Sequence, residues 1–538
     1  MKGDFSRDTF DPLKHFTRVL MQQGRVQLDA DWNEQTALLW HYIRALSADL
    51  IGQHGGPDGL CGFAIVTPDK LNTLTDAEKA GADDLGELKP SLLGNFLIGT
   101  GRYYVGGLLC ENERMALYAP SKNAPGYDQR DLRADELSEG DYFIYLDAWE
   151  QHVTSFEDES IREVALGSQG PDTTTRARVA WQVRALDIAN LPDFLKLDCQ
   201  TIMNSKAWLD LVGSLQPDNR GRLRAKADEP EDPDSFEPCI TSPDARFRGA
   251  ENQLYRVEIH RGGTVGTPAT FKWSRENGSV VLPVRNVSGK VVTLDSMGRD
   301  ARSGVEVGDW VEIYDSDSPR IDDLTPLVQV VAVDPVEMTV TLSAEPHAET
   351  ERDERASPTM SNPLLRRWDQ KAGDPRRGGL ELRDGAALIK EVSAGDDDWL
   401  ELEDGVRIQF LPNGAYRAGD YWLIPARTET GDVEWPGDVG KPEPRPPQGV
   451  EHYYAPLARI VVSANRAVTV TADFRRQFLP LARCAAARTA VIRDERDTIA
   501  VTPSAVTPSA VTPSAVNPPG VRPSGVNPSG VNPSGVPQ

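Results

Sequence analysis

Apolar residues recur along residues 32–50 with the spacing of one helix face. Trp32, Thr36, Leu39, Ile43, Leu46 and Leu50 follow one another at alternating intervals of four and three residues. These are the a and d positions of a heptad pattern. The face either packs on its own domain or forms a seam for self-association, because fewer than three heptads do not separate the two. The candidate subunit contacts are Trp32, Leu39, Ile43, Leu46 and Leu50.

The limits of this helix follow from local signals. Asn33 is the expected N-cap, and Gly52 is expected to end the helix just after Ile51. The preceding segment, residues 22–25, is predicted as a short strand. Strand and helix together are expected to form a docking piece.

From about residue 61 the pattern becomes that of β-strands. Residues 103–105 and 108–110 flank Gly106-Gly107, which is typical of a two-residue hairpin. Residues 142–149 are apolar nearly throughout and predict a strand buried on both faces. Residues 179–183 alternate and predict a half-buried strand. One short helix is expected within 203–215.

Residues 269–343 predict a compact β unit. Asn277-Gly278 and Ser288-Gly289 are turn pairs between β-branched or aromatic runs. Residues 305–313 predict two strands bent at Gly308-Asp309. Short strands this close together indicate a small barrel or a strongly bent sheet. The remaining strands are expected at 328–333 and 338–342.

The last third of the folded part is also β-rich. Residues 344–380 are polar and rich in Arg, Pro and Gly, which predicts a linker or a long surface loop. Strands are expected at 406–410 and 416–425, joined through Asn413-Gly414. A final strand region is expected at 457–470.

These patterns predict a mainly β protein with a minor α part, built from β-sandwich or small β-barrel modules. The predicted units are an N-terminal strand–helix docking segment at 1–60, a β-rich domain with an irregular acidic insertion at 61–260, a small barrel-like module at 261–345, a β-rich C-terminal domain at 346–500 and a proline-rich tail at 501–538.

The tail is a pentapeptide repeat with proline at every fifth position from Pro503 to Pro533. It cannot bury enough apolar surface to fold alone. In a polyproline-like conformation it would reach roughly 120 Å, at ~3.1 Å per residue. Two interpretations remain open: a disordered tail, or a strap that becomes ordered against a neighbouring subunit.

The net charge limits which classes of partner the chain could bind. The 538 residues include 82 Asp and Glu but only 58 Lys and Arg, a formal net charge of −24. So acidic a surface repels nucleic acid and anionic lipid, and no apolar run is long enough for a membrane span. Acids near the start replace the apolar core of a signal peptide. We therefore expect assembly in the cytoplasm.

Residues for catalysis or metal binding do not stand out. The five cysteines form no CxxC pair, and no two of the seven histidines have the spacing of a zinc site. Phosphate-binding glycine loops and the serine nucleophile elbow are also missing from the sequence. We predict no catalytic, cofactor-binding or metal-binding residue. A weaker hypothesis is a glycan contact made by Trp149, Glu150, Glu434 and Trp435.

Several stretches together resemble an uncharacterised bacterial family. They are MKGDF (1–5), LMQQGRVQLDADWNEQ (20–35), YLDAWE (145–150), FKWSRENG (271–278) and GDYWLIPAR (419–427). This family is a domain of unknown function whose genes tend to lie beside those of phage-tail-like contractile injection systems. The resemblance covers roughly residues 1–475 and implies a context without implying an activity.

The resemblance implies a non-enzymatic structural component of such a particle, associated with the baseplate or attached outside it. Its partners would be other particle subunits and further copies of itself, and the assembled particle could be released from the cell. Two alternatives remain: a glycan-binding or glycan-cleaving module carried by the particle, and an effector delivered as cargo.

Overall fold

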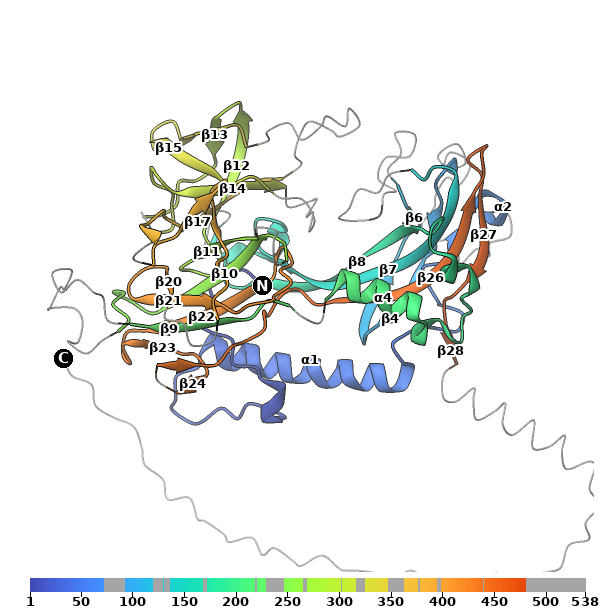
Figure 1. Cartoon of the computed structure of the whole chain (residues 1–538), viewed down its shortest axis with the longest axis horizontal. Coiled ribbons are helices and arrows are strands. Elements are labelled where there is room, and N and C mark those ends of the chain that lie inside the picture. The colour runs from blue at the N-terminus through green and yellow to red at the C-terminus, as the bar shows by residue number, and fades with distance from the viewer. Residues whose placement is uncertain are drawn as a thin grey trace, which may run out of the picture. The chain divides into compact units, whose positions relative to one another are not determined.

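The structure is a computed structural model that describes residues 1–71, 92–119, 129, 136–167, 172–217, 220–228, 246–264, 269–300, 302–315, 325–346, 362–375, 378–393, 398–438 and 440–479. The repeat tail lies outside these residues. The described part is mainly β, as expected (Figure 1). Its chain forms one compact unit, Met1–Leu479.

The longest strands form a four-stranded sheet in the order β27-β26-β7-β8. Its central strand β7 (Gly140–Val153) pairs antiparallel with both β8 (Arg176–Asp187) and β26 (His452–Val462). Residues 142–149 are all buried, which confirms the expectation of burial on both faces. The outer strand β27 (Val468–Asp473) follows β26 directly.

A second four-stranded sheet, in the order β28-β1-β4-β5, contains the predicted hairpin. β4 (Gly101–Val105) and β5 (Leu108–Asn112) pair in register around the Gly106-Gly107 turn. Both glycines have positive φ, which the turn requires. The other strands are β1 (His54–Pro57) and β28 (Gln477–Phe478).

Helix α1 (Asp29–Ile51) ends at Gly52, as predicted. It begins four residues before the predicted cap at Asn33, with Leu28 at the N-cap. The Asp31 carboxylate accepts a hydrogen bond from the Leu28 amide at 3.4 Å. Asp29 and Asp31 favour this start because negative charge stabilises the first turn of a helix.

A six-stranded sheet carries the barrel as an insertion. The sheet order is β18-β19-β11-β10-β22-β23, and the chain leaves after β11, builds the barrel and returns to pair β19 with β11. The strands are β10 (Gln253–Arg261), β11 (Thr270–Ser274), β18 (Leu382–Arg383), β19 (Ala386–Leu388), β22 (Tyr421–Arg427) and β23 (Asp432–Val433).

The barrel is closed and has six strands, in the order β12-β13-β16-β15-β14-β17. The Ser288-Gly289 turn and the strands expected at 328–333 and 338–342 are confirmed. The strands are β12 (Val281–Ser288), β13 (Val291–Leu294), β14 (Trp310–Asp315), β15 (Val328–Asp334), β16 (Thr339–Leu342) and β17 (Pro363–Trp368).

Two barrel predictions were wrong. The segment 305–313 supplies one strand instead of two, because the chain turns at Gly308 with φ +102° and enters β14 only at Trp310. The predicted linker 344–380 contains β17, which pairs with β12 and β14 and closes the barrel. Its buried Leu364, Leu365 and Trp368 outweigh the polar character of the surrounding stretch.

The remaining elements are short. The small sheets contain β2 (Ile65–Val66), β3 (Leu97–Ile98) and β6 (Ala116–Leu117); β9 (Leu223–Ala227), β20 (Leu400–Glu401) and β21 (Val406–Phe410); and β24 (Gly437–Asp438) with β25 (Lys441–Pro442). The other helices are α2 (Pro68–Leu71) and α4 (Lys206–Leu215), with 3-10 turns η1 (Pro12–Lys14), η3 (Glu159–Ile161), η4 (Val164–Leu166), η5 (Pro192–Lys196) and η6 (Ile202–Asn204).

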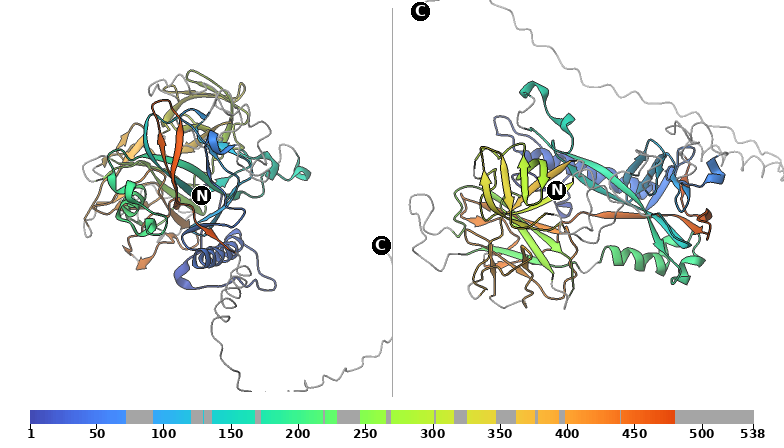
Figure 2. Two further views of the ribbon diagram at one scale, coloured as in Figure 1. Left: turned by 90° about the vertical axis from the view of Figure 1, so that its right-hand side faces the viewer. Right: turned by 90° about the horizontal axis from the view of Figure 1, so that it is seen from above.

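Pairing across the chain divides the molecule differently from the sequence-based boundaries. The boundary expected at 260/261 falls inside β10, and the barrel covers 281–368. β7 pairs with β26 although about 300 residues separate them. Figure 2 shows the barrel and α2 toward opposite ends of the long strands β7, β8 and β26.

Candidate functional site

Helix α1 presents its large apolar side chains outward. The five predicted contact residues lie on one face and are largely exposed: Trp32 74%, Leu39 53%, Ile43 49%, Leu46 45% and Leu50 71%. The opposite face buries only Ala30 and Leu38. Figure 1 shows α1 along one side of the sheets. The helix thus turns an apolar stripe to solvent, while Leu38 and Ala30 are buried on its other side.

The inward face of α1 holds the helix on the sheets. Leu38 is buried, Trp40 packs against the core of the two four-stranded sheets, and Arg44 makes polar contacts. The Arg44 guanidinium lies 4.6 Å from the centre of the Tyr453 ring and 3.9 Å from a Glu150 carboxylate oxygen. The Arg44 carbonyl lies against Gly107, where a Cβ atom would collide with it. The helix can therefore attach to the body without using its outward face.

The segment before the helix continues the exposed apolar surface. Residues 12–28, which we call the arm, contain a turn at Gly24 instead of the strand predicted at 22–25. The Val19 amide donates to Gln35 of α1 at 2.9 Å and so fastens the arm to the helix. The exposed apolar residues of the arm are Leu13, Phe16, Leu20, Met21, Val26 and Leu28.

The arm and the outward face of α1 together form what we call the arm–helix surface. Of the 25 large apolar residues exposed in the described part of the chain, 13 lie within residues 1–50. Monomeric proteins rarely expose a continuous apolar patch of more than a few hundred Å². This concentration marks the surface as the main candidate for contact with another polypeptide.

A second unusual feature is a chain of buried charges between the six-stranded sheet and the barrel, which we call the ion network. Arg256 Nε contacts Glu258 at 2.6 Å, and Lys272 Nζ contacts Glu258 at 3.5 Å. Lys272 also reaches Glu312 of β14 at 2.5 Å, and Arg366 of β17 reaches the same carboxylate at 3.2 Å. All five side chains are buried.

The cations hold both glutamates of the network ionised. Burial alone would raise the pKa of Glu258, but Lys2, Arg256 and Lys272 outweigh it and hold this pKa well below its usual value. Burial likewise opposes ionisation of Glu312, and Lys272, Lys2 and Arg366 lower its pKa to about 2. Lys2 lies 3.0 Å from Glu258 and so ties the N-terminal segment to the network.

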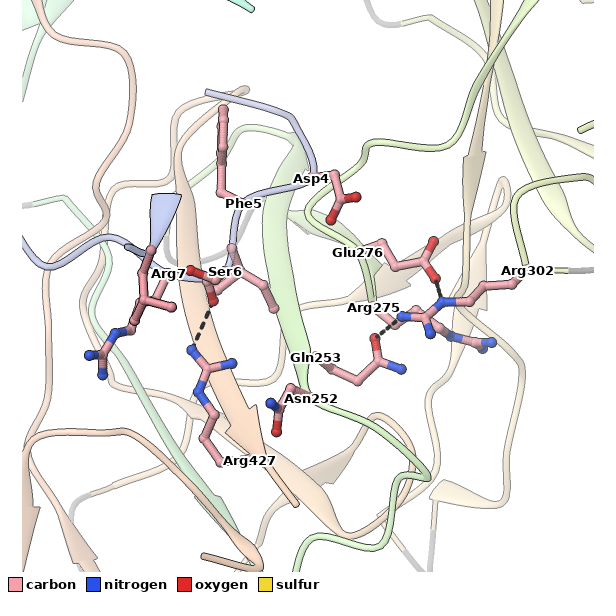
Figure 3. Close-up of a pocket in the computed structure, with 12 residues that line it drawn as sticks. Asp4, Phe5, Ser6, Arg7, Asn252, Gln253, Arg275, Glu276, Arg302 and Arg427 are labelled. Carbon is pink, nitrogen blue, oxygen red and sulfur yellow. Dashed lines mark hydrogen bonds and ion pairs between the residues drawn. The ribbon is translucent and has the colours of Figure 1, made fainter. Parts of the chain in front are cut away.

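A hollow of about 350 Å³ lies beside this network, between the N-terminal segment and the six-stranded sheet (Figure 3). Arg302 points at Glu276 and Gln253, and Arg427 donates to the Ser6 carbonyl at 2.8 Å. Burial raises the pKa of Glu276 to about 7. Arg427 therefore anchors the N-terminal segment, while Arg302 bonds Gln253 of β10 and Glu276.

The weak glycan candidates fall into two separate arrangements. Trp149 is only 3% exposed and stacks on His452 at 5.1 Å, which leaves little ring surface for a sugar. Its neighbour Glu150 faces Arg44. Glu434 pairs with Arg7 at 3.2 Å and with Arg427 at 3.3 Å. A glycan contact at these residues stays a prediction.

Trp435, the fourth candidate, is partly buried against the core of the six-stranded sheet. Its indole nitrogen donates to the Glu443 carbonyl at 2.8 Å. Across the described residues, no group of three or more His, Cys, Asp or Glu is placed to hold a metal ion. No helix in those ranges combines the length and apolarity needed to cross a membrane.

The sequence reasoning missed the ion network. A signal was present, since Arg256, Glu258 and His260 alternate along β10 with Tyr255, Val257 and Ile259. Such alternation is typical of a strand with one solvated face. The barrel covers the charged face instead, so the charges pair with one another.

Comparison with known proteins assigns the chain to a protein family. Neither a curated protein nor a solved structure matches the chain. The model of a family described as a family of unknown function (DUF6519) matches residues 1–213 and 215–529. The chain therefore belongs to the DUF6519 family.

Proposed function

We propose that this protein is a non-enzymatic structural subunit of a phage-tail-like contractile injection particle, at the baseplate or in an outer attachment. The observation that carries the proposal is the arm–helix surface. Its apolar side chains are exposed on a helix that is already fastened to the body by other contacts. Burying such side chains against a partner is favourable by roughly 25 cal/mol per Å² of apolar area.

The ion network supports the structural part of this proposal. Buried charged groups often mark active sites, but in the network each carboxylate faces cations of the protein itself at 2.5–3.5 Å. Such pairs hold the sheet and the barrel in one arrangement and present no free group to a substrate. A subunit that transmits force in a contractile particle would benefit from this rigidity.

The type of particle rests on the family resemblance of the N-terminal and strand segments described above. Assembly would take place in the cytoplasm and the protein would then remain part of the particle. Other particle subunits and further copies of this chain are the proposed partners.

Particles from a strain that lacks this gene, and from a strain complemented with it, test the proposal. We expect cryo-EM density and mass-spectrometric copy numbers to show the chain as a stoichiometric component that the deletion removes. A complementing chain with Leu39→Asp and Ile43→Asp should fail to restore it, while Leu209→Asp, at an exposed leucine of α4, should succeed. Particles unchanged in density and protein content on deletion would reject the proposal.

A further inference from the structure

We infer that the arm–helix surface binds a second copy of this chain, with the two α1 helices packed antiparallel about a two-fold axis. The inference rests on the proposed function, because it names the partner of the same surface.

The spacing of the outward face fits another helix. Trp32, Thr36, Leu39, Ile43, Leu46 and Leu50 repeat every 3.5 residues on average. An apolar seam of this period stays in contact with a partner helix of the same period, whose side chains fit between its own. A second α1 supplies that partner. In a two-fold interface the same patch serves both copies.

Charge on α1 favours the antiparallel direction. Asp29 and Asp31 lie in the first turn, and Glu34 follows in the next. Asp29 falls at an a position of the seam, so a parallel pair would bring the Asp29 carboxylates of the two copies together, and like charges at close range are destabilising. An antiparallel pair separates the two Asp29 carboxylates by about the length of a 23-residue helix, ~35 Å.

Charge on the arm favours this chain as the partner. Lys14, Arg18 and Arg25 make no ion pair with any described residue, and residues 12–28 contain no acid. The whole chain has a net charge of −24. The basic side chains of the arm can therefore pair with carboxylates of another copy, which offsets part of the repulsion between two chains of this net charge.

The area of the surface indicates that arm and helix must act together. A large apolar side chain carries on the order of 100 Å² of apolar area. At the observed exposures α1 offers on the order of 350 Å², while a stable complex buries ~800 Å² per partner. Including the arm roughly doubles the area and brings it to that range.

Light scattering on the purified full chain, after size-exclusion chromatography, tests the inference. We expect twice the chain mass of 59.0 kDa. Leu39→Asp combined with Ile43→Asp should raise the dissociation constant at least 100-fold and give a monomer with an unchanged circular dichroism spectrum. The control is Leu209→Asp on α4, where the leucine is 56% exposed, close to the 53% of Leu39. This variant should stay dimeric.

Disulfide cross-linking tests whether the two α1 helices run antiparallel. An antiparallel pair centred on its seam places Thr36 of one copy near Leu46 of the other. Mixed Thr36→Cys and Leu46→Cys chains should therefore form a disulfide-linked dimer on oxidation, while each variant alone should behave like the wild type, which controls for the native cysteines. Self-linking of both single variants would indicate parallel helices and overturn the arrangement.

The outcomes for this inference and for the proposed function are separable. A chain that is monomeric in solution, or forms a larger oligomer than a dimer, overturns the inference even if particles contain it. A dimer broken by Leu39→Asp with Ile43→Asp supports the inference even if particles lack the chain, in which case the proposed function alone fails.

Discussion

Helix α1 and the ion network depart from the usual placement of side chains in opposite ways: α1 exposes apolar residues, and the network buries charged ones. α1 turns Trp32 and Leu50 to solvent, each more than 70% exposed. The sheet and barrel enclose Glu258 and Glu312, each 3–4% exposed. Burying apolar surface is favourable, whereas burying a charge is unfavourable unless an opposite charge pairs with it.

The comparison shows where the side chains of each region find their interaction partners. The charges of the network are satisfied within the chain, because β10, β11, β14 and β17 bring cations and carboxylates to within 3.5 Å of one another. The outward apolar side chains of α1, such as Trp32 and Leu50, remain largely exposed among the described residues. We therefore expect substitutions in the network to act on folding and substitutions on α1 to act on association.

The largest effect is expected at Glu258. Glu258→Gln removes a carboxylate that faces Lys2, Arg256 and Lys272, so buried cations lose their counter-charge. We expect the free energy of unfolding to fall by about 3–5 kcal/mol, measured by urea denaturation. Asp295→Asn, which breaks the exposed pair with Arg285, should change it by less than ~1 kcal/mol. Equal effects would mean that the network does not stabilise the fold.

Substitutions at two isoleucines, one buried and one exposed, distinguish effects on folding from effects on association. Ile424 of β22 is fully buried, and Ile424→Ala should lower the free energy of unfolding by about 2–5 kcal/mol. Ile43 of α1 is 49% exposed, and Ile43→Ala should change the stability of the monomer by less than ~1 kcal/mol while it weakens self-association. Denaturation and light scattering of both variants measure this. A large loss of monomer stability in Ile43→Ala would place that side chain in the core.

Gly107 connects the hairpin turn with α1. Gly107→Ala places a Cβ against the Arg44 carbonyl in a residue with φ +80°, and should destabilise the protein by about 1–3 kcal/mol. Gly59 has a similar φ of +78° but no atom near its Cβ position. Gly59→Ala therefore measures the backbone strain alone. If both variants lose the same stability, the contact with α1 contributes nothing measurable.

The smallest effect is a pH dependence that arises beside the network. Burial outweighs Arg275 and raises the pKa of Glu403 from 4.5 to about 7. Between these two values Glu403 binds more protons in the folded than in the unfolded state, so its own contribution to stability should fall as pH rises, by up to about 1.4 kcal/mol per pH unit. Glu276 acts in the same sense, whereas His54, His152 and His260, whose pKa values burial lowers, act in the opposite sense.

Glu403→Gln should remove this contribution, seen as a difference in pH dependence from the wild type in urea titrations between pH 5 and pH 7. Glu429→Gln, at an exposed glutamate of the β22–β23 connection, is the matched control and should leave the slope in place. Glu312 should act in the opposite sense, since its pKa is lowered to about 2. Its stabilisation is present above pH 4.5 and is lost as pH falls through 2. The same pH dependence in the wild type and in Glu403→Gln would contradict this assignment.

Local signals predicted much of the fold. The hairpin at Gly106-Gly107, the strand at 328–333 and the end of α1 at Gly52 are confirmed, because each depends on residues adjacent in the chain. The barrel strand β17 was read as part of a linker, since its role depends on pairing with β12 and β14, which lie far from it in sequence. The outward apolar residues of α1 could be picked out from the sequence because their periodicity is local, and their role as subunit contacts stays a prediction.

The sequence by itself determined the β-rich class, the acidic charge and the apolar seam of α1, since composition and spacing are properties of neighbouring residues. Tertiary structure alone decided which way that seam points and which charges become buried. The side of a helix or strand that meets solvent depends on what the rest of the chain covers. For α1 the inward face is held by Arg44 and Gly107, and for β10 the charged face is covered by a barrel inserted after β11.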